Sequence, residues 1–492
     1  MVEGLYSNDI KDKEYELLRY SFDNHPILAE NVNERERYLS ALTQIIYSYS
    51  DDRMRWDFKR SEFAETLEVN IEYSMSSADI IRFSKPVKRK ISFWRKEKTL
   101  YSYILILESL YFIRLLSAKI PDIHCFKEFK ILKIKEKYVR LLCDYFSFVI
   151  DNNYESARQI IESVNDKSIR KQFVYFYDIV FWNNCYTELP ITNVAVCATM
   201  SAGKSTFINA MLGMDCIPAR NEACTDKITI IRDNDRLKKI IGSCVKADGT
   251  KIYSNRVDRR LLDEWNDNQN VLATRLEADF EEIGCENRIT VIADTPGTNN
   301  SGNVAHHGKT LGYIEYNKID VIVLLFNSEY IGTNDSDILL KEVKSIADKN
   351  GARVVFGLNK IDCFDDNELL SIDSMIKSLH DEIIAAGYPS PIIIPFSANA
   401  ARIFKLVLKG KQLTKKEMRE FDLLYQFFTD FNSSEHMINF VGKNNSDYYK
   451  YSETDRVLNV FGADYSYNSL ISALGNTGIF SLEEIIQKQP NG

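Results

Sequence analysis

Several features that would assign this chain of 492 residues to a familiar class are missing. Its nine cysteines form no C-x-x-C pair, and we expect reduced, buried thiols rather than a disulfide framework or a zinc site. His306 and His307 are adjacent, so they lack the i, i+4 spacing of a helical metal site, and we expect them in a solvated loop. The opening residues 1–6 are too acidic and carry too few apolar residues for a secretory signal.

Long apolar runs and excess positive charge are missing as well. No stretch reaches the roughly 20 uninterrupted apolar residues of a membrane span. The nearest candidate, residues 101–118, contains Glu108 and Arg114 and is better explained as a buried core helix. A net charge of −8 argues against a nucleic-acid partner. We therefore expect a cytoplasmic protein.

The chain is long enough for two or three domains, and the spacing of its apolar residues changes at two points. Residues 1–185 are predicted to form an all-α domain, because apolar residues recur at three- and four-residue spacing. Residues 402–492 read as a small helical part with a short terminal helix that completes the preceding domain. The helices expected outside the central part are 15–20, 36–49, 100–117, 127–148, 160–182 and 415–431.

The central part, residues 186–401, alternates short apolar runs with helical patterns such as 335–348 and 367–386. Such alternation predicts an α/β domain with a mostly parallel, doubly wound sheet and a ligand at the carboxyl ends of its strands. The strands expected are 193–197, 227–232, 239–246, 288–293, 321–326, 353–358 and 391–395.

Residues 198–206, Ala-Thr-Met-Ser-Ala-Gly-Lys-Ser-Thr, resemble a phosphate-binding loop between a strand and a helix. Gly203 lets the backbone approach a polyphosphate, Lys204 can reach the β/γ-phosphates, and Ser205 can hold Mg²⁺. We expect the nucleotide contacts at Ser201, Ala202, Gly203, Lys204, Ser205 and Thr206. Ala198 replaces the first glycine of the motif.

Three further elements follow predicted strands in the required order. Asp294-Thr-Pro-Gly297 offers a carboxylate for Mg²⁺ and a glycine amide for the γ-phosphate. In Asn359-Lys360-Ile-Asp362 the Asp362 carboxylate can accept the N1 and N2 hydrogens of guanine, while Asn359 helps fix the base edge and the Lys360 stem covers the ring. In Ser397-Ala398 the Ala398 amide can reach the guanine O6.

Together these residues resemble the large GTPases of the dynamin family, particularly the bacterial dynamin-like proteins, over residues 191–401. The resemblance implies a P-loop GTPase domain that binds GTP or GDP with Mg²⁺ and pairs with a second copy across its nucleotide face. It also implies that Thr225 ligates Mg²⁺ and closes over the γ-phosphate, with Thr229 as the competing candidate. Lys204, Ser201 and Thr225 are then the catalytic candidates, and Ser205, Thr225 and Asp294 the metal ligands.

Two departures from that family keep alternatives open. Met200 stands where animal dynamins carry a glutamine that positions the attacking water, so hydrolysis can be slow or depend on a partner molecule. Fewer than 100 residues follow Ser397, so a stalk would have to come mostly from residues 1–185 or from a second dynamin-like subunit.

A basic cluster in the first part could contact an anionic membrane. Phe93 and Trp94 are flanked by lysines and arginines, a composition that suits lipid headgroups, and an exposed helix face or loop is the alternative. The basic residues are Lys85, Lys88, Arg89, Lys90, Arg95, Lys96 and Lys98.

The sequence thus predicts a dynamin-like GTPase that hydrolyses GTP to GDP and phosphate, assembles with itself and reaches the membrane periphery. The alternative is a slow or non-hydrolysing switch that recruits a protein partner through its helical part. An ATPase is a third reading, which requires that Asn359 and Asp362 do not recognise guanine.

Overall fold

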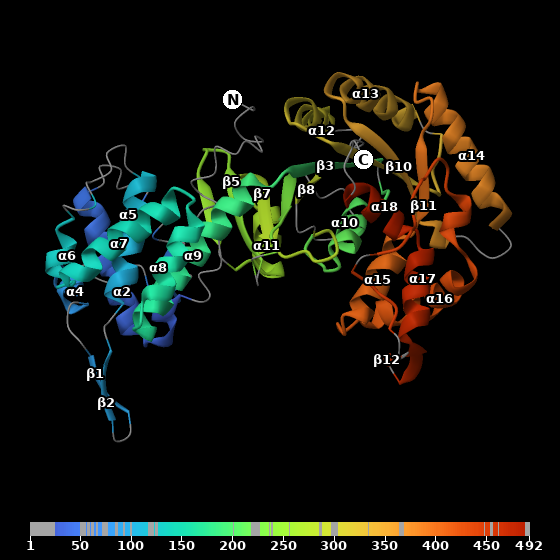
Figure 1. Ribbon diagram of the computed structural model, residues 1–492. Coiled ribbons are helices and arrows are strands. Elements are labelled where there is room, and N and C mark those ends of the chain that lie inside the picture. The colour runs from blue at the N-terminus through green and yellow to red at the C-terminus, as the bar shows by residue number, and fades with distance from the viewer. Residues whose placement is uncertain are drawn as a thin grey trace. The chain divides into compact units, whose positions relative to one another are not determined.

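The computed structural model describes residues 25–49, 56, 60, 63–64, 67–70, 77–83, 87–91, 94–98, 101–116, 123, 126–199, 201–217, 227–235, 237, 240–254, 256–284, 288–296, 304–332, 334–363, 369–446, 448–452, 456–460 and 462–487. Two compact units make up the chain, one within Asp9–Leu189 and the other from Pro190 onward (Figure 1). Among the described residues, no helix combines the length and apolar content needed to cross a membrane. The helix expected over residues 15–20 lies outside the described residues.

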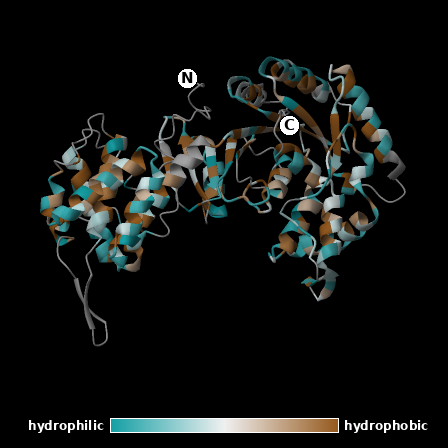
Figure 2. Ribbon diagram, viewed as in Figure 1, coloured by the Kyte–Doolittle hydropathy of each residue, from teal (hydrophilic) through white to brown (hydrophobic). Residues whose placement is uncertain are grey.

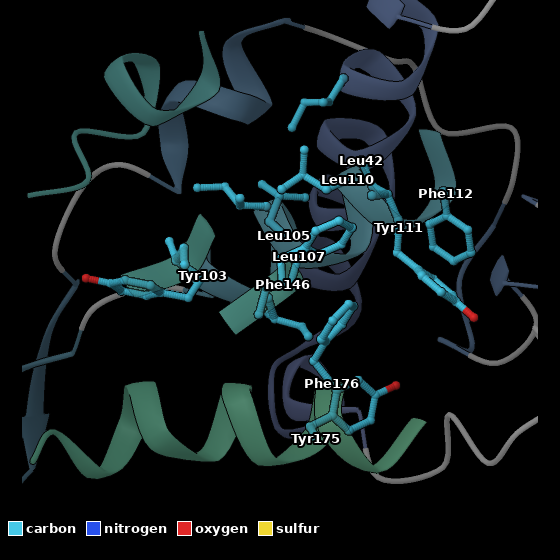
Figure 3. Packing of buried hydrophobic residues seen from close by; sticks show 14 of the residues in the cluster. Leu42, Tyr103, Leu105, Leu107, Leu110, Tyr111, Phe112, Phe146, Tyr175 and Phe176 are labelled. Carbon is cyan, nitrogen blue, oxygen red and sulfur yellow. The ribbon is translucent and has the colours of Figure 1, made fainter. Parts of the chain in front are cut away.

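The first unit is a helical bundle around helix α5 (Ser102–Leu116). Almost every side chain of α5 is buried, including Glu108, whose carboxylate accepts a hydrogen bond from Tyr38 and pairs with His25. Figure 3 shows Leu105, Leu107 and Leu110 packed among aromatic rings of the neighbouring helices. A core helix is therefore confirmed at this position. Its partners are η3 (Pro26–Ala29), α2 (Val32–Tyr49), α4 (Ser77–Arg82), α6 (Glu128–Ile131), α7 (Glu136–Ile150), α8 (Tyr154–Ser163) and α9 (Lys167–Glu188).

Two of the predicted helices are each split in two. Residues 127–148 form α6 and α7, because Lys133 adopts a left-handed backbone conformation with φ of 51° between them. Residues 160–182 are interrupted before α9, where the Asp166 carboxylate accepts the amide hydrogens of Ser168 and Ile169 and so caps a new helix. The apolar spacing continues across both breaks, so periodicity alone did not reveal them.

The described residues of the basic cluster lie on two strands rather than on a helix face or in a loop. Strands β1 (Val87–Ile91) and β2 (Trp94–Lys98) pair antiparallel as a separate two-stranded sheet. The register sets Arg89 opposite Lys96 and Lys90 opposite Arg95, and it brings Ile91 opposite Trp94 at the turn. Figure 1 shows this hairpin extending away from the helices of its own unit.

The second unit is built on a nine-stranded sheet in the order β11-β10-β9-β3-β8-β4-β7-β5-β6. The strands are β3 (Ile191–Ala198), β4 (Ile228–Asp233), β5 (Ile241–Lys246), β6 (Lys251–Ser254), β7 (Val271–Ala278), β8 (Ile289–Asp294), β9 (Val321–Asn327), β10 (Arg353–Asn359) and β11 (Ile392–Phe396). The five strands β11, β10, β9, β3 and β8 are mutually parallel, whereas β4 runs antiparallel to β8. The mostly parallel α/β sheet is therefore confirmed.

Helices flank this sheet, and Figure 2 shows apolar residues concentrated in its central strands. They are α10 (Lys204–Leu212), α11 (Arg259–Asp267), α12 (Val304–Tyr316), α13 (Asn334–Asn350), α14 (Leu369–Ala385), α15 (Ala398–Leu408), α16 (Lys415–Asp430), α17 (Tyr467–Asn476) and α18 (Ile479–Gln487), with the short turns η5 (Ile361–Cys363) and η7 (Ser433–His436). Strands β12 (Val457–Val460) and β13 (Ala463–Ser466) pair antiparallel as a separate two-stranded sheet. His306 and His307 lie in α12 rather than in a loop.

The last helices of the chain belong to the nucleotide-binding side of this unit. Helix α15 packs on α10 and α17, and α18 contacts α10, β3 and β11. Gly478, with φ of 83°, sits so close to β11 that a Cβ there would lie 2.4 Å from the Pro395 carbonyl oxygen. The Thr477 carbonyl also accepts the Ser397 amide hydrogen at 3.0 Å. Residues 477–487 therefore help to shape the edge where the strands end.

Candidate functional site

The phosphate loop connects β3, in the middle of the parallel strands, to α10. Its backbone turns through left-handed conformations at Ser201 (φ 58°) and Gly203 (φ 81°). Gly203 is the N-cap of α10. Among the described residues no side chain caps the first amide hydrogens of this helix, which are the groups that bind anions at a helix N-terminus. Ser205 and Thr206 are half-buried in the first turn, and Met200 lies outside the described residues. The loop thus has the form of a phosphate cradle.

Lys204 and Asp294 meet beneath this loop. The Lys204 ammonium hydrogen-bonds Oδ1 of Asp294 at the end of β8, and both side chains are buried. Burial raises the pKa of Asp294, while the neighbouring Lys204 charge acts in the opposite direction. The second oxygen, Oδ2, is buried and has no hydrogen-bond partner in the described part of the chain. A buried carboxylate oxygen without a partner suits a hard cation such as Mg²⁺.

Two neighbouring threonines hold the Asp294 loop against the central strand. The Thr295 hydroxyl donates to the Val196 carbonyl oxygen on β3 at 2.8 Å. The Thr310 hydroxyl of α12 donates to the Pro296 carbonyl oxygen at 2.8 Å. Gly297 and Thr225 lie outside the described residues, so of the three candidate metal ligands the structure describes Ser205 and Asp294.

Asn359 connects the phosphate loop to the loop after β11. Its amide nitrogen donates to the Ala202 carbonyl oxygen at 2.8 Å, and its amide oxygen accepts the Ala398 amide hydrogen at 2.9 Å. In this structure the Asn359 side chain acts as a brace between two loops. Gly203 is part of the same arrangement, because a Cβ at this position would lie 2.5 Å from the Asn359 amide nitrogen.

Asp362 follows in the short turn η5. Its carboxylate bonds the Ser397 side chain, and burial raises its pKa. The oxygen Oδ1 is buried and has no hydrogen-bond partner among the described residues. Ser397 itself caps α15, because its hydroxyl accepts the Ala400 amide hydrogen at 3.1 Å. Asp362 therefore presents one satisfied and one unsatisfied acceptor at the carboxyl edge of the sheet.

Three residues at the end of β9 and directly after it support this loop and were not singled out from the sequence. Ser328 donates its amide hydrogen to the Asn359 carbonyl oxygen at 3.0 Å and its hydroxyl hydrogen to the Lys360 carbonyl oxygen at 3.1 Å. Glu329 pairs with the Lys360 ammonium at 3.0 Å, which lowers the pKa of Glu329. Asn327 accepts the Glu329 amide hydrogen at 3.0 Å. The sequence feature that could have identified these residues is a run of three polar residues at the end of an apolar strand.

Thr229, the competing metal candidate, lies inside β4. Its hydroxyl hydrogen-bonds the Thr274 hydroxyl on β7 at 2.8 Å. Its backbone is the register partner of Asp294 across the antiparallel β4–β8 pair. The hydroxyl is therefore engaged within the sheet.

The sequence of this unit matches the family model of the dynamin family over residues 194–361. The predicted resemblance to dynamin-like GTPases is thereby confirmed for the nucleotide-binding domain. Among curated proteins, an uncharacterised protein encoded in the xynA 3' region of Caldicellulosiruptor sp. (strain Rt8B.4) is 26% identical over 279 residues, which is 56% of this chain and 63% of that protein. The match thus spans less than two thirds of that relative.

The solved structures that are similar to this chain match it at low sequence identity and with low TM-scores. A structure of an oligomerised bacterial dynamin pair, described as a mechanism for long-range sensing and tethering of membranes, is 15% identical over 79% of this chain and 56% of that chain, with a TM-score of 0.35. A variant of Aquifex aeolicus Era with one tyrosine replaced by alanine, bound to GDP and AlF4⁻, is 17% identical over 46% of this chain and 59% of that chain, with a TM-score of 0.25.

Proposed function

We propose that the α/β unit binds GTP with Mg²⁺ and hydrolyses it to GDP and phosphate. One observation carries this proposal. Two buried carboxylate oxygens, Asp294 Oδ2 and Asp362 Oδ1, have no hydrogen-bond partner within the described part of the chain, and they flank the phosphate loop along the carboxyl edge of the same sheet. An unpaired buried acceptor is costly, by about 1–3 kcal/mol, unless a ligand satisfies it. A metal ion at one end and a guanine at the other would satisfy both.

Guanine selection is assigned to Asp362. The N1 and N2 hydrogens of guanine form a donor pair that a carboxylate accepts, whereas adenine offers no such pair and would leave Oδ1 unsatisfied. Asn359 holds the Ala398 amide in place, and this amide is our candidate donor to the guanine O6. The Lys360 stem, held by Glu329, is the candidate cover for the base ring.

Phosphate binding requires Lys204 to change partners. In this structure Lys204 neutralises Asp294, and the same ammonium is the group that would contact the β- and γ-phosphates. Ser205, Asp294 and Thr225 are the proposed metal ligands. Bound Mg²⁺ would offset the negative charge of the phosphate oxygens.

In the proposed reaction the oxygen of water forms a bond to the γ-phosphorus while the bond to the bridging oxygen breaks. GDP leaves, and the proton of the water passes to solvent. Met200 supplies no polar atom to orient that water, so we expect slow turnover in the monomer and faster turnover when a second copy contacts the nucleotide face. Turnover per molecule should then rise with protein concentration, and Lys204→Ala should abolish it. Phosphate release equal in wild type and Lys204→Ala would contradict the proposal.

A slow switch is the second candidate function, and Met200 favours it. In that case GTP remains bound without hydrolysis, and the helical unit engages a protein partner only in that state. A single-turnover experiment separates the two functions. GTP that persists intact on the protein at every protein concentration supports the switch, and release of GDP and phosphate supports the enzyme.

Membrane attachment is proposed for the β1–β2 hairpin. An isolated two-stranded ribbon has little core of its own, and six of the ten residues in these two strands are basic against one acidic residue, Glu97. Such a ribbon suits anionic headgroups, at about 1 kcal/mol for each basic residue near the surface. The test is sedimentation with phosphatidylserine vesicles, where changing Arg89, Lys90, Arg95 and Lys96 to glutamine should abolish binding. Neutral vesicles are the control, and binding that survives the four changes would contradict this role.

A further inference from the structure

A buried amide at the end of β9 has a hydrogen-bond donor without an acceptor. Asn327 is the last residue of β9, and its side chain is fully buried. Its oxygen Oδ1 accepts the Glu329 amide hydrogen at 3.0 Å, which fixes the orientation of the amide group. Its nitrogen Nδ2 has no hydrogen-bond partner in the ranges that the structure describes. A buried donor that has lost its hydrogen bonds to water is costly, so Nδ2 indicates an acceptor that comes into reach when a ligand binds.

The Asn327 side chain lies on the face of the sheet that carries α10. Gly357 identifies this face, because a Cβ there would lie 2.8 Å from atoms of both Leu325 and Phe396. The Phe396 ring in turn packs edge-on against Phe207 of α10, with the ring centroids 5.5 Å apart. Side chains of a strand alternate between its two faces, so Asn327 shares the face of Leu325, two residues earlier. The unpartnered amide is therefore on the same side of the sheet as the helix that follows the phosphate loop.

The two neighbouring strands place Asn327 between Asn359 and the start of the phosphate loop. On one side, Asn359 of β10 is its register partner, and the Asn359 amide donates to the Ala202 carbonyl oxygen. On the other side, the Thr199 amide hydrogen, directly after β3, bonds the Leu325 carbonyl oxygen at 3.2 Å. The phosphate loop thus leaves β3 next to the end of β9 and reaches Asn359 three residues later, at Ala202.

Ser201 lies between these two points and directly precedes Ala202. Its backbone is left-handed, with φ of 58°, a conformation that a residue other than glycine keeps only when its neighbours hold it. We infer that Asn327 is a positioning residue of the phosphate loop, whose Nδ2 donates to the Ser201 carbonyl oxygen when a nucleotide occupies the loop. This inference rests on the proposed GTP function. GDP and GTP both carry the phosphates that the loop holds, so the two nucleotides depend on Asn327 equally, and the choice of base does not depend on it.

The first test compares two substitutions that remove the donor. Asn327→Asp keeps an acceptor for the Glu329 amide hydrogen and regains a donor when its carboxyl is protonated, whereas Asn327→Leu is neutral and has no donor at any pH. Affinities for a fluorescent GDP and a non-hydrolysable GTP analogue are measured with Mg²⁺, each relative to the wild type at the same pH. At pH 8 we expect both variants to bind both nucleotides about tenfold more weakly, because each complex lacks one buried hydrogen bond.

The pH profile separates the donor from the charge that aspartate introduces. Burial disfavours the charged carboxylate, so Asn327→Asp should be largely protonated at pH 5 and recover most of its affinity. Asn327→Leu should recover none. If repulsion between the aspartate and the phosphates were the cause, Asn327→Leu would bind as tightly as the wild type at both pH values, and that result would overturn the inference.

The matched control is Asn317→Asp, at the opposite end of the same strand. Asn317 precedes β9 and is 8% exposed, and its amide already donates to the Tyr313 carbonyl oxygen at 2.8 Å. This substitution should lower the free energy of unfolding and leave both nucleotide affinities unchanged. If Asn317→Asp lost as much affinity as Asn327→Asp, the effect would be one of general stability, and the positioning role would be wrong.

The second test uses the wild type, so it does not depend on the folding of a variant. In a crystal structure of the protein with GDP and Mg²⁺, the Asn327 Nδ2 should lie about 2.7–3.2 Å from the Ser201 carbonyl oxygen. An Nδ2 that still has no acceptor would contradict the inference, and so would an Nδ2 that contacts the nucleotide itself.

The outcomes separate this inference from the proposed function. If the wild type binds neither nucleotide, the proposed function fails and the inference fails with it. If the wild type binds both, and both Asn327 variants bind them as tightly as the wild type, the positioning role fails while the GTP function stands.

Discussion

Lys204 at the start of α10 and Asp294 at the end of β8, 90 positions apart in the chain, form a buried ion pair. The two groups that would hold phosphate and metal thus neutralise each other. A buried charge without a partner is strongly unfavourable, so the pairing with Lys204 stabilises the buried Asp294 carboxylate.

Because Lys204 and Asp294 form an ion pair, we expect substitutions of the two residues to have non-additive effects on the free energy of unfolding. Lys204→Met should lower the free energy of unfolding by about 3–5 kcal/mol at neutral pH, because it leaves the Asp294 carboxylate buried and unpaired. The double variant Lys204→Met/Asp294→Asn should recover much of that loss without recovering nucleotide binding. Urea denaturation of the nucleotide-free protein measures both effects.

The same variant has a defined pH dependence. Burial already raises the pKa of Asp294, and removing Lys204 removes the charge that opposes the rise. The folded protein then binds a proton more tightly than the unfolded chain, so stability falls as pH increases. The loss in Lys204→Met should therefore be smaller at pH 5 than at pH 8, and equal losses would contradict an unpaired Asp294.

Asp362→Asn should change the base preference. An amide presents a donor to the guanine N1 and N2 hydrogens, so we expect GTP affinity to fall at least a hundredfold and xanthosine triphosphate to bind better than GTP. Competition against a fluorescent nucleotide measures the order. Asp381→Asn on the exposed face of α14 is the control, and unchanged GTP affinity in Asp362→Asn would refute the guanine assignment.

Gly203→Ala should weaken both GTP and GDP at least tenfold. The new Cβ would lie 2.5 Å from the Asn359 amide nitrogen, which must then release the Ala202 carbonyl oxygen. Gly332→Ala is a matched control, because Gly332 has the same φ of 81° with nothing within 4 Å of the added Cβ. Equal effects of the two changes would mean that backbone strain, not the Asn359 brace, is what matters.

Glu483 of α18 predicts a second pH effect. Burial raises the pKa of this carboxyl to about 7, with Lys405 acting against the rise and Glu282 adding to it. Between the unfolded value of 4.5 and about 7 the folded state holds the extra proton, so stability should decline by roughly 3 kcal/mol over that interval. Glu483→Gln should flatten this part of the curve in denaturation from pH 5 to 8. An identical slope in the variant would exclude Glu483 as its source.

The order of elements in the nucleotide-binding domain could be predicted because each chemical motif follows an apolar strand. Lys204, Asp294, Asn359, Asp362 and Ser397 all fall at carboxyl ends of strands, where the parallel sheet gathers them. Strand β7 was missed since its sequence, Val-Leu-Ala-Thr-Arg-Leu-Glu-Ala, mixes helix-favouring residues with only two β-branched ones.

Other features depend on tertiary contacts that local patterns do not encode. The motif predicted that Asn359 helps fix the base edge, but it did not show that both polar atoms of this side chain bond the backbone of two distant loops. The hairpin at residues 87–98 was also hidden, because a run of charge carries no period that distinguishes a ribbon from a helix face. Nothing in the sequence distinguishes Lys405 from an ordinary surface lysine, whereas in the structure it is buried and pairs with Glu282 and Glu483.

Helix α18 also has a consequence for synthesis on the ribosome. The phosphate loop is translated near residue 204, but Glu483, which pairs with Lys405 behind α10, is translated almost 280 residues later. At about 5–20 residues per second, roughly 14–56 s separate the two. During that interval the nascent sheet lacks the helix that contacts α10, β3 and β11. The helical unit precedes the nucleotide-binding unit in the chain and can fold earlier, whereas the nucleotide-binding unit is completed only after α18 has been synthesised.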